Sequence, residues 1–357
     1  MNFNWSLLRR RAEINGPSVS VPAMDGALKP NDLLEAAEEV CRQTDADNLA
    51  LGEDGVYFSG GLDLFALDDS RSTSRRIASF PSPVSCLAAL GDQLAVGLDH
   101  GQVRIVGGRH DNTCIERLHD RPLVSPVAAC FESETSLVLA IGSQRHAPSA
   151  WKSDLLERRW TGSLWRIDLP TGRSTIIADG LGYPYGILPD RGGRLIVAES
   201  WAHRILAVSA SKTTVIADDL PFYPARLAAT TTGDDVLVCG FAPRRQIVEF
   251  VLREPSFLQR MLTTLDEQHW IAPSLRSGLD GQPELLGAIR QGASKPWAPS
   301  LSYGLVATMD RSGRFLASRH SRASGRRHGT TSAVAVGADV LVSAKGGHMI
   351  IRVRDDV

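Results

Sequence analysis

The sequence predicts an all-β fold, a six-bladed β-propeller, on three observations. Residues 175–188 (TIIADGLGYPYGIL) recur as residues 214–227 (TVIADDLPFYPARL), a period of about forty residues that is typical of a propeller blade. From residue 48 onward, short apolar runs alternate with Gly/Asp turns, as in strands joined by hairpins. Hydrophobic residues make up 43% of the chain and charged residues 22%, an ordinary composition with enough apolar material for a core. A propeller places its chemistry at one end of a central channel.

The predicted blades follow one another in chain order. Turn residues mark their hairpins, for example Asp54-Gly55 in the first blade, Gly91-Asp92 in the second and Thr171-Gly172 in the third, because Gly readily adopts the positive φ that tight turns need. The blades are expected at residues 48–80, 84–119, 127–179, 185–218, 226–242 continued by 303–320, and 331–353.

The sixth blade contains three predicted strands, so a fourth must come from elsewhere. Residues 17–22 (PSVSVP) are the predicted N-terminal strand that closes the last blade and removes an exposed sheet edge. The chain then divides into an N-terminal arm with this strand and a helix (1–45) and a single propeller domain (46–357). Insertions interrupt the propeller at 144–161 and 244–300.

Two segments are predicted to be helical. Residues 30–43 begin with Pro-Asn-Asp, and four apolar residues of this stretch share a helical face: Leu33, Leu34, Ala37 and Val40. Residues 244–270 have nearly helical spacing of apolar residues, and Pro255 is expected to end or kink that stretch. The second segment lies within blade five, so we expect it to cover one mouth of the channel.

Charge and cysteine content exclude several classes of function. The formal net charge is −1, which provides no general attraction to nucleic acid or to anionic membranes. The five cysteines are scattered, as in a protein of a reducing compartment. No apolar run approaches the length of a membrane span or of a signal-peptide core, so we expect a cytoplasmic protein. Residues 311–328 hold six arginines and no acidic residue, and predict a rim for a small anion.

Two segments carry a family resemblance. GYPYGILPD (182–190) and LIVAESWAHRIL (195–206) resemble the "NGVALSPD…VAET…RI" core of strictosidine synthase-like proteins. That family consists of six-bladed propellers related to the gluconolactonase and senescence-marker-30 lactonases. Residues 154–172, 219–227, 295–315 and 328–347 extend the resemblance over roughly residues 46–353. It implies a propeller with a small-molecule site, but not one particular activity, because one fold hosts many reactions.

The resemblance also implies where a metal ion would bind. Metal-dependent relatives hold a calcium-like ion through a Glu at the first inner strand and Asn or Asp at later ones, since hard cations need oxygen ligands. At these positions the chain has Asp47, Tyr185, Ala225 followed by Arg226, and Ser125-Pro126. Asp47 is therefore the remaining candidate metal ligand, and a divalent cation is possible but not expected. The catalytic glutamate of the alkaloid-forming synthase aligns with Thr331, so strictosidine formation itself is not expected.

The loops at the channel mouth carry aromatic side chains and a few polar groups, a combination that suits a small organic ligand. His146 and His328 are candidate general bases because histidine titrates near neutrality. Arg226, together with Arg326 and Arg327, is a candidate anion ligand. The predicted catalytic residues are His146, His328, Tyr185 and Asp47. The predicted substrate-binding residues are Arg226, Trp151, Tyr183, Tyr223, Trp201, Thr331 and Lys345. His100, His203 and His348 are expected at the same mouth, and Glu199 is expected to be a structural partner of Arg204.

Three functions remain open at this point. The first is hydrolysis of a small ester or lactone at the channel mouth. The second is a metal-independent biosynthetic enzyme that condenses, cyclises or isomerises a small metabolite, which the residues Tyr185, Ala225 and Thr331 favour. The third is a non-catalytic propeller that binds a ligand or a partner. The expected partner in the first two cases is a small-molecule substrate, and the oligomeric state is open.

Overall fold

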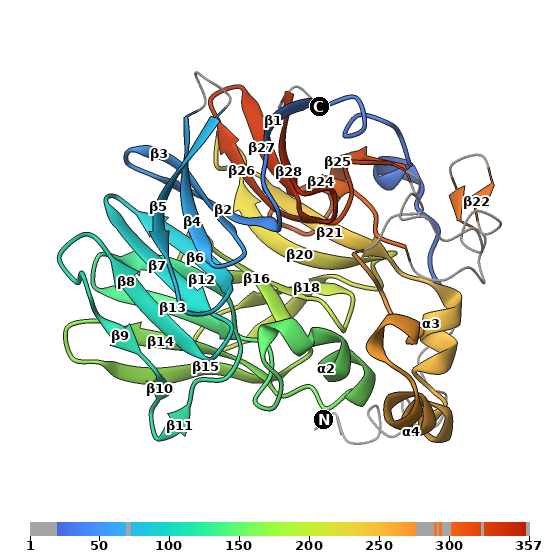
Figure 1. The fold of residues 1–357 in the computed structure, drawn as a ribbon, viewed down its shortest axis with the longest axis horizontal. Coiled ribbons are helices and arrows are strands. Elements are labelled where there is room, and N and C mark those ends of the chain that lie inside the picture. The colour runs from blue at the N-terminus through green and yellow to red at the C-terminus, as the bar shows by residue number, and fades with distance from the viewer. Residues whose placement is uncertain are drawn as a thin grey trace, which may run out of the picture.

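The computed structural model describes residues 20–68, 73–275, 301–322 and 325–354, and the backbone of a hairpin formed by β22 (Ile289–Arg290) and β23 (Ala293–Ser294). Six four-stranded antiparallel sheets surround a central channel (Figure 1). The first strand of each sheet contacts the first strand of the next, and the sixth contacts the first. The predicted six-bladed propeller is confirmed.

The blades follow the predicted order. Blade one has β2 (Ala46–Gly52), β3 (Gly55–Gly60), β4 (Asp63–Asp68) and β5 (Thr73–Ser79); blade two has β6 (Val84–Leu90), β7 (Gln93–Leu98), β8 (Gln102–Val106) and β9 (Cys114–Ile115). Blade three has β12 (Pro126–Ser133), β13 (Ser136–Ile141), β14 (Gly162–Asp168) and β15 (Arg173–Leu181). Blade four has β16 (Pro184–Pro189), β17 (Leu195–Glu199), β18 (Arg204–Val208) and β19 (Thr213–Ala217). Blade five has β20 (Phe222–Ala229), β21 (Val236–Pro243), β24 (Leu305–Met309) and β25 (Phe315–His320). A short hairpin of β10 (Arg117–Leu118) and β11 (Arg121–Pro122) follows blade two.

Blade six is closed by an N-terminal strand, as predicted, but by a different segment. Its strands are β26 (Thr330–Val336), β27 (Asp339–Ala344), β28 (Met349–Arg354) and β1 (Glu38–Arg42). β1 runs antiparallel to β28, with Glu38 opposite Arg352. The assignment of the closing strand to residues 17–22 was wrong: residues 20–22 form no strand, and residues 17–19 lie outside the described part.

The predicted helix over residues 30–43 was also wrong. Residues 32–37 form turns and residues 38–42 form β1. The apolar spacing that indicated a helix is satisfied differently, because Leu34, Ala37 and Val40 are all buried against the propeller while Leu33 is 46% exposed. Pairing with the open edge of β28 overrides the local helical preference, since an unpaired strand edge is costly.

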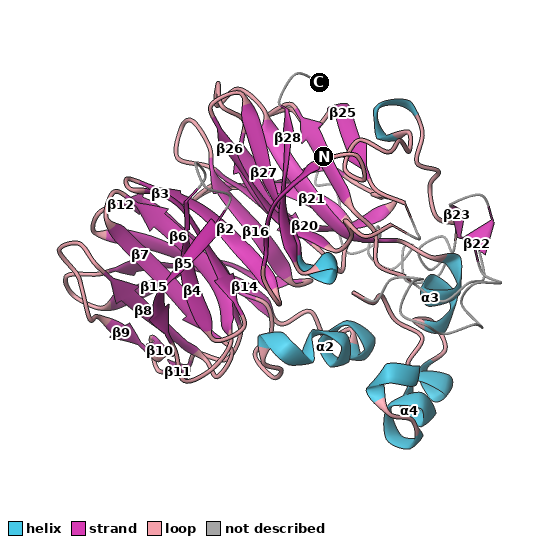
Figure 2. Cartoon of the chain, turned by 45° about the horizontal axis from the view of Figure 1, so that its top comes forward, coloured by secondary structure: helices cyan, strands magenta, loops and turns pink. Residues whose placement is uncertain are grey.

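Two insertions place helices on one side of the ring (Figures 1 and 2). The insertion at 144–161 forms a 3₁₀ turn (Pro148–Ala150) and α2 (Trp151–Glu157) between β13 and β14. The segment 244–270 forms α3 (Gln246–Val251), α4 (Pro255–Thr264) and a 3₁₀ turn (Glu267–His269). Pro255 separates the two helices as predicted, because it is the first residue of α4, where its missing N–H is not needed. Both insertions share one apolar cluster with the inner strands.

The described residues include no helix long and apolar enough to cross a membrane. The short remaining 3₁₀ segments are Gly26–Leu28, before β1, and Lys345–Gly347, between β27 and β28. The second of these carries a residue of the candidate site described next.

Candidate functional site

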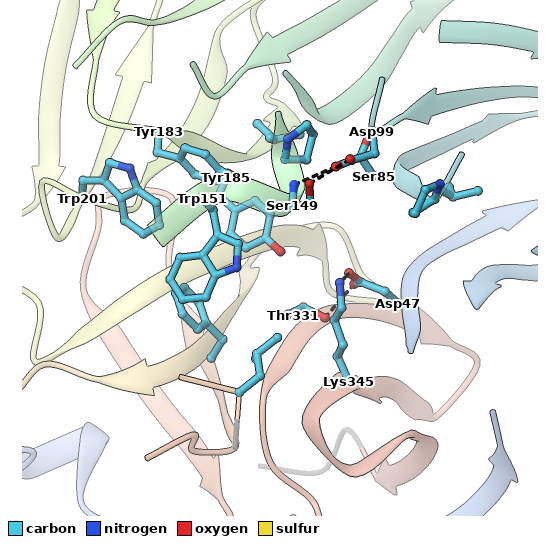
Figure 3. Close-up of a pocket in the computed structure, with 16 residues that line it drawn as sticks. Asp47, Ser85, Asp99, Ser149, Trp151, Tyr183, Tyr185, Trp201, Thr331 and Lys345 are labelled. Carbon is cyan, nitrogen blue, oxygen red and sulfur yellow. Dashed lines mark hydrogen bonds and ion pairs between the residues drawn. The ribbon is translucent and has the colours of Figure 1, made fainter. Parts of the chain in front are cut away.

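A cavity of about 240 Å³ lies at the channel mouth that the 144–161 insertion covers. Its lining comes from the starts of the inner strands, from the residues that follow the second strands, from the 144–161 insertion and from Leu275 (Figure 3). The polar members are Asp47, Ser85, Asp99, Ser149, Thr331 and Lys345; the aromatic members are Trp151, Tyr183, Tyr185, Trp201 and Phe241; the others are Pro83, Val84, Val127, Pro148 and Leu275.

The aromatic side chains form one wall of the cavity. Tyr183 stacks on Trp201 with ring centroids 4.4 Å apart, and Trp151 packs edge-on against Phe241 at 5.7 Å. Gly142 makes room for the Tyr183 ring, because a Cβ there would lie 2.6 Å from a ring carbon. Such a wall suits the apolar body of an organic ligand.

Asp154 of α2 fixes Trp201 in this wall. The indole Nε1 donates to Asp154 Oδ2 at 2.9 Å, and both side chains are buried. Burial raises the pKa of Asp154, and the hydrogen bonds from Ser143 and Trp201 act in the opposite direction. The insertion is therefore tied to blade four through a buried carboxylate.

Asp47 is the centre of the polar side of the cavity. Its carboxylate accepts hydrogen bonds from Arg226 Nη1 at 3.0 Å, Thr331 Oγ1 at 2.6 Å and Lys345 Nζ at 2.9 Å, and from the Asn48 amide at 2.7 Å. Burial alone would raise the pKa of Asp47, but the charges of Arg226 and Lys345 and the hydrogen bonds lower it to about 2. Asp47 is therefore a permanent anion and a weak base.

The two cations beside Asp47 lie at different depths. Lys345 lines the cavity. Burial is the largest single effect and lowers its pKa, but the Asp47 charge, Tyr185 and the hydrogen bond to Asp47 together raise the pKa above its ordinary value. Arg226 lies behind Asp47 and lines a second cavity of about 560 Å³ formed by the inner strands. Its guanidinium also lies over the Tyr185 ring, 4.7 Å from the centroid.

Asp99 and Ser149 form a second polar group in the cavity, and the sequence interpretation missed both. Asp99 Oδ1 accepts the Ser149 amide at 2.6 Å, and Asp99 Oδ2 accepts the Ser149 hydroxyl at 2.8 Å (Figure 3). This pair joins the 144–161 insertion to blade two. The position of Asp99 directly after β7, one residue before the predicted His100, could have revealed it.

Seven of the predicted site residues line the cavity: Asp47, Trp151, Tyr183, Tyr185, Trp201, Thr331 and Lys345. Tyr223 is fully buried behind the wall, 6.1 Å from the Trp201 ring and 5.7 Å from Phe241. Glu199 is, as expected, a buried structural residue, since it accepts the Gly182 amide at 2.7 Å and Arg204 Nε at 2.5 Å.

The two histidines predicted as general bases are not among the lining residues. His146 Nε2 lies 3.1 Å from Glu157 Oε1 at the other end of the insertion. His328 is buried beside Gly346. The remaining predicted histidines also lie elsewhere: His203 pairs with Glu249 at 3.3 Å, His348 lies 3.9 Å from Asp45, and the His100 amide donates to Ser82 Oγ.

The site residues do not fit a calcium ion. Asp47 already neutralises a guanidinium and an ammonium, and these two charges repel a further cation from the same carboxylate. Among the described residues, no three His, Cys, Asp or Glu side chains are grouped in a way that could hold a metal ion.

Neither a family model nor a curated protein sequence matches the chain. Among solved structures, the chain is similar to regucalcin from Agrobacterium tumefaciens strain C58, described as a calcium-binding protein. The TM-score is 0.53 at 10% sequence identity, over 89% of this chain and 93% of that one. The likeness is one of fold. A chain of a nidogen–laminin complex is also similar, with a TM-score of 0.45 at 10% identity over 78% of this chain and 86% of that one, too low to support any argument. The resemblance to strictosidine synthase-like proteins stays a prediction.

Proposed function

We propose that the protein is a metal-independent hydrolase that cleaves a small ester or lactone in the cavity at the channel mouth. The observation that carries the proposal is the composition of this cavity. An aromatic wall, an ammonium group and a half-buried carboxylate line one space of about 240 Å³. Ester hydrolysis needs a cation or donor for the carbonyl oxygen and an acceptor for the proton of water.

Lys345 is the proposed group for the carbonyl oxygen. Its raised pKa keeps it protonated at neutral pH, and an ammonium group has three N–H donors, of which one is directed to Asp47. The others are available to an oxygen that becomes negatively charged in the transition state. Asp47 holds the ammonium in place, and its pKa of about 2 makes it unsuitable as the base.

Asp99 is the proposed base. Its carboxylate oxygens are held by Ser149 and retain lone pairs for a water molecule. The water oxygen bonds to the acyl carbon while its proton passes to Asp99. The acyl C–O bond then breaks, and the leaving oxygen takes the proton from Asp99, so that one water is consumed. The wall around Trp151 and Trp201 binds the apolar part of the substrate.

A panel of lactones and aryl esters, assayed in EDTA and in calcium, tests this function. We expect turnover that is the same in both buffers. Lys345→Met should lower kcat by roughly 100-fold or more, as the loss of an oxyanion donor does in other hydrolases, and Asp99→Asn should also lower it. Lys212→Met, at an exposed lysine between β18 and β19 that does not line the cavity, is the matched control. Turnover that requires calcium, or that survives both cavity substitutions, contradicts the proposal.

One observation favours a second candidate, a non-catalytic ligand-binding propeller. Both carboxylates of the cavity are engaged, Asp47 by four donors and Asp99 by two. A compound from the same panel that quenches tryptophan fluorescence and raises Tm, but is recovered unchanged, supports binding without catalysis. Hydrolysis products in the same sample exclude it.

A further inference from the structure

We propose that the Arg226 guanidinium is a built-in channel cation: it occupies a site lined by oxygen atoms in the central channel. When this side chain is removed by substitution, the same site binds a divalent metal ion. Its tests measure metal binding and stability without a substrate, so their outcome does not depend on the proposed hydrolase function.

The contacts of Arg226 reach across the ring. Arg226 projects from β20 of blade five. Its Nη1 donates to Asp47 Oδ1 in blade one at 3.0 Å, and its Nη2 donates to the Ser85 carbonyl in blade two at 2.6 Å and to the Val127 carbonyl in blade three at 3.4 Å. The guanidinium packs on Tyr185 of blade four.

Blade six completes the cluster through Asp47. Thr331 of β26 donates its hydroxyl to Asp47 Oδ1 at 2.6 Å, the same oxygen that accepts Arg226. An inner-strand residue from every blade is thus within one network, and Arg226 is its cation. A guanidinium suits this place because its planar fork directs several N–H groups at fixed angles.

The groups around the guanidinium are those that hard metal ions bind. The Asp47 carboxylate, the carbonyls of Ser85 and Val127 and the Thr331 hydroxyl are all oxygen donors, and calcium takes six to eight of these, water included. In the natural chain the guanidinium occupies the centre of this set and leaves no room for a metal ion, whereas Lys345 is directed to the other carboxylate oxygen, Asp47 Oδ2, at 2.9 Å. Asp47 has a side chain only 3% exposed, so it requires a cation in either case.

Arg226 also separates the two cavities. Asp47, Ser85, Val127 and Tyr185, which it contacts, line the cavity at the mouth. Arg226 itself lines the cavity formed by the inner strands. The Arg226 guanidinium therefore lies at the floor of the proposed binding site. A metal ion at this place would exchange with solvent, whereas a side chain is attached to the protein and cannot leave.

Calcium titrations of five proteins test the proposal: wild type, Arg226→Ala, Arg226→Lys, Asp47→Asn and the double variant Arg226→Ala with Asp47→Asn. The readouts are Tm in calcium and in EDTA and the luminescence of bound terbium. For wild type we expect the same Tm in both buffers, within about 1 °C, because no ligand-linked stabilisation occurs. Arg226→Ala should lower Tm in EDTA by roughly 5 °C, the usual effect of leaving a buried charge without its main partner.

Calcium should restore part of that loss in Arg226→Ala, and terbium should bind with sensitised emission that calcium competes away. Arg226→Lys keeps the charge but not the three-way contact, so its Tm should fall without a calcium response. The double variant is the matched control: it also lacks Arg226, but without the Asp47 carboxylate it should show no calcium response.

Four results overturn the proposal. A calcium-dependent Tm of wild type that Asp47→Asn abolishes means that the natural chain binds the metal beside Arg226. A folded Arg226→Ala that ignores calcium and terbium means that the oxygen set is not a metal site. Equal calcium responses in Arg226→Ala and the double variant mean that the ion binds elsewhere. If Arg226→Ala folds in neither buffer, the proposal fails as well, whereas folding in calcium alone supports it.

Discussion

Lys345 Nζ and Asp47 Oδ2 are 2.9 Å apart, and this ion pair joins blade six to blade one at the seam where the ring closes. Lys345 follows β27, and Asp47 lies within β2, 298 positions earlier. The same contact holds the ammonium group that we assign to the carbonyl oxygen of the substrate. One ion pair therefore serves both the closure of the ring and the geometry of the cavity.

The first prediction concerns Asp47 and pH. Its pKa is about 2, below the ordinary 3.8, so the stability that it contributes is present above about pH 4 and is lost as pH falls towards 2. Asp47→Asn leaves Arg226 and Lys345 without their anion and should cost about 3–5 kcal/mol of unfolding free energy at pH 7. Urea denaturation at several pH values measures both effects.

The difference between wild type and Asp47→Asn should shrink as pH approaches 2. Asp32→Asn, at an exposed pair with Arg322, is the control, since exposed ion pairs contribute at most about 1 kcal/mol. A wild-type and Asp47→Asn difference that stays constant down to pH 2 contradicts the assignment.

The second prediction concerns His320, a fully buried residue on β25. Its Nδ1 lies 3.0 Å from the Tyr303 hydroxyl and its Nε2 lies 2.8 Å from Ser318 Oγ. Burial lowers its pKa from 6.5 to about 4, so the folded state binds a proton at His320 only at a lower pH than the unfolded state does. Stability should fall by roughly 3 kcal/mol between pH 6.5 and pH 4 from this residue.

His320→Gln should flatten that part of the stability curve, whatever its effect at neutral pH. His119→Asn, at a histidine whose side chain is 71% exposed, should leave the curve unchanged. An equal slope in wild type and His320→Gln would show that another group is responsible.

The third prediction concerns the aromatic wall. Trp201→Phe keeps the packing with Tyr183 but removes the Nε1 hydrogen bond to Asp154. A buried carboxylate that loses a donor costs about 1–3 kcal/mol, and the insertion should close less tightly over the cavity. We expect lower stability and a raised KM, or a raised Kd if the protein only binds.

Trp165→Phe is the comparison for this experiment. Trp165 is buried and donates its Nε1 to Ser163 Oγ at 2.9 Å, but it belongs to a cluster formed mainly by blades two and three. It should lower stability without changing KM. The idea fails if the two substitutions affect KM alike.

The fourth prediction concerns the closing strand. Val40 of β1 is 2% exposed and Leu33 is 46% exposed, a contrast that a helix with both residues on its apolar face would not produce. Val40→Asp buries an unpaired charge and frees the edge of β28, so Tm should fall by several degrees and the protein should aggregate. Leu33→Asp should leave Tm and light scattering unchanged. Equal effects of both would favour a helical N-terminal arm.

Local sequence was sufficient to predict the blades but not the closure of the ring. Each hairpin is encoded by adjacent apolar runs and a turn such as Asp54-Gly55, so its strands could be recognised without the rest of the chain. The partner of β1 is β28, with Glu38 opposite Arg352. This pairing joins distant parts of the chain, so it cannot be predicted from the residues around β1 alone. The spacing of Leu34, Ala37 and Val40 fits a helix and also fits burial in a turn followed by a strand.

The candidate site shows the same limit. Asp47, Tyr185 and Thr331 could be predicted because they begin inner strands, and the fold brings those positions together. Asp99 and Ser149 were missed because their contact depends on how the 144–161 insertion folds back on blade two. His146 and His328 were proposed for their chemistry, but their sequence positions gave no information on which way the side chains point.

The pairing of β1 with β28 also has a consequence for biosynthesis. Of the described strands, β1 is translated first and its partner β28 last. Until β28 is made, β1 has no strand to pair with and blade six cannot pack against blade one. A nascent chain folds from its N-terminus onward, and contacts between distant segments form late. Until β27 and β28 have been made the propeller is an open arc, and the cavity, whose lining spans the seam between Asp47 and Lys345, forms only after that point.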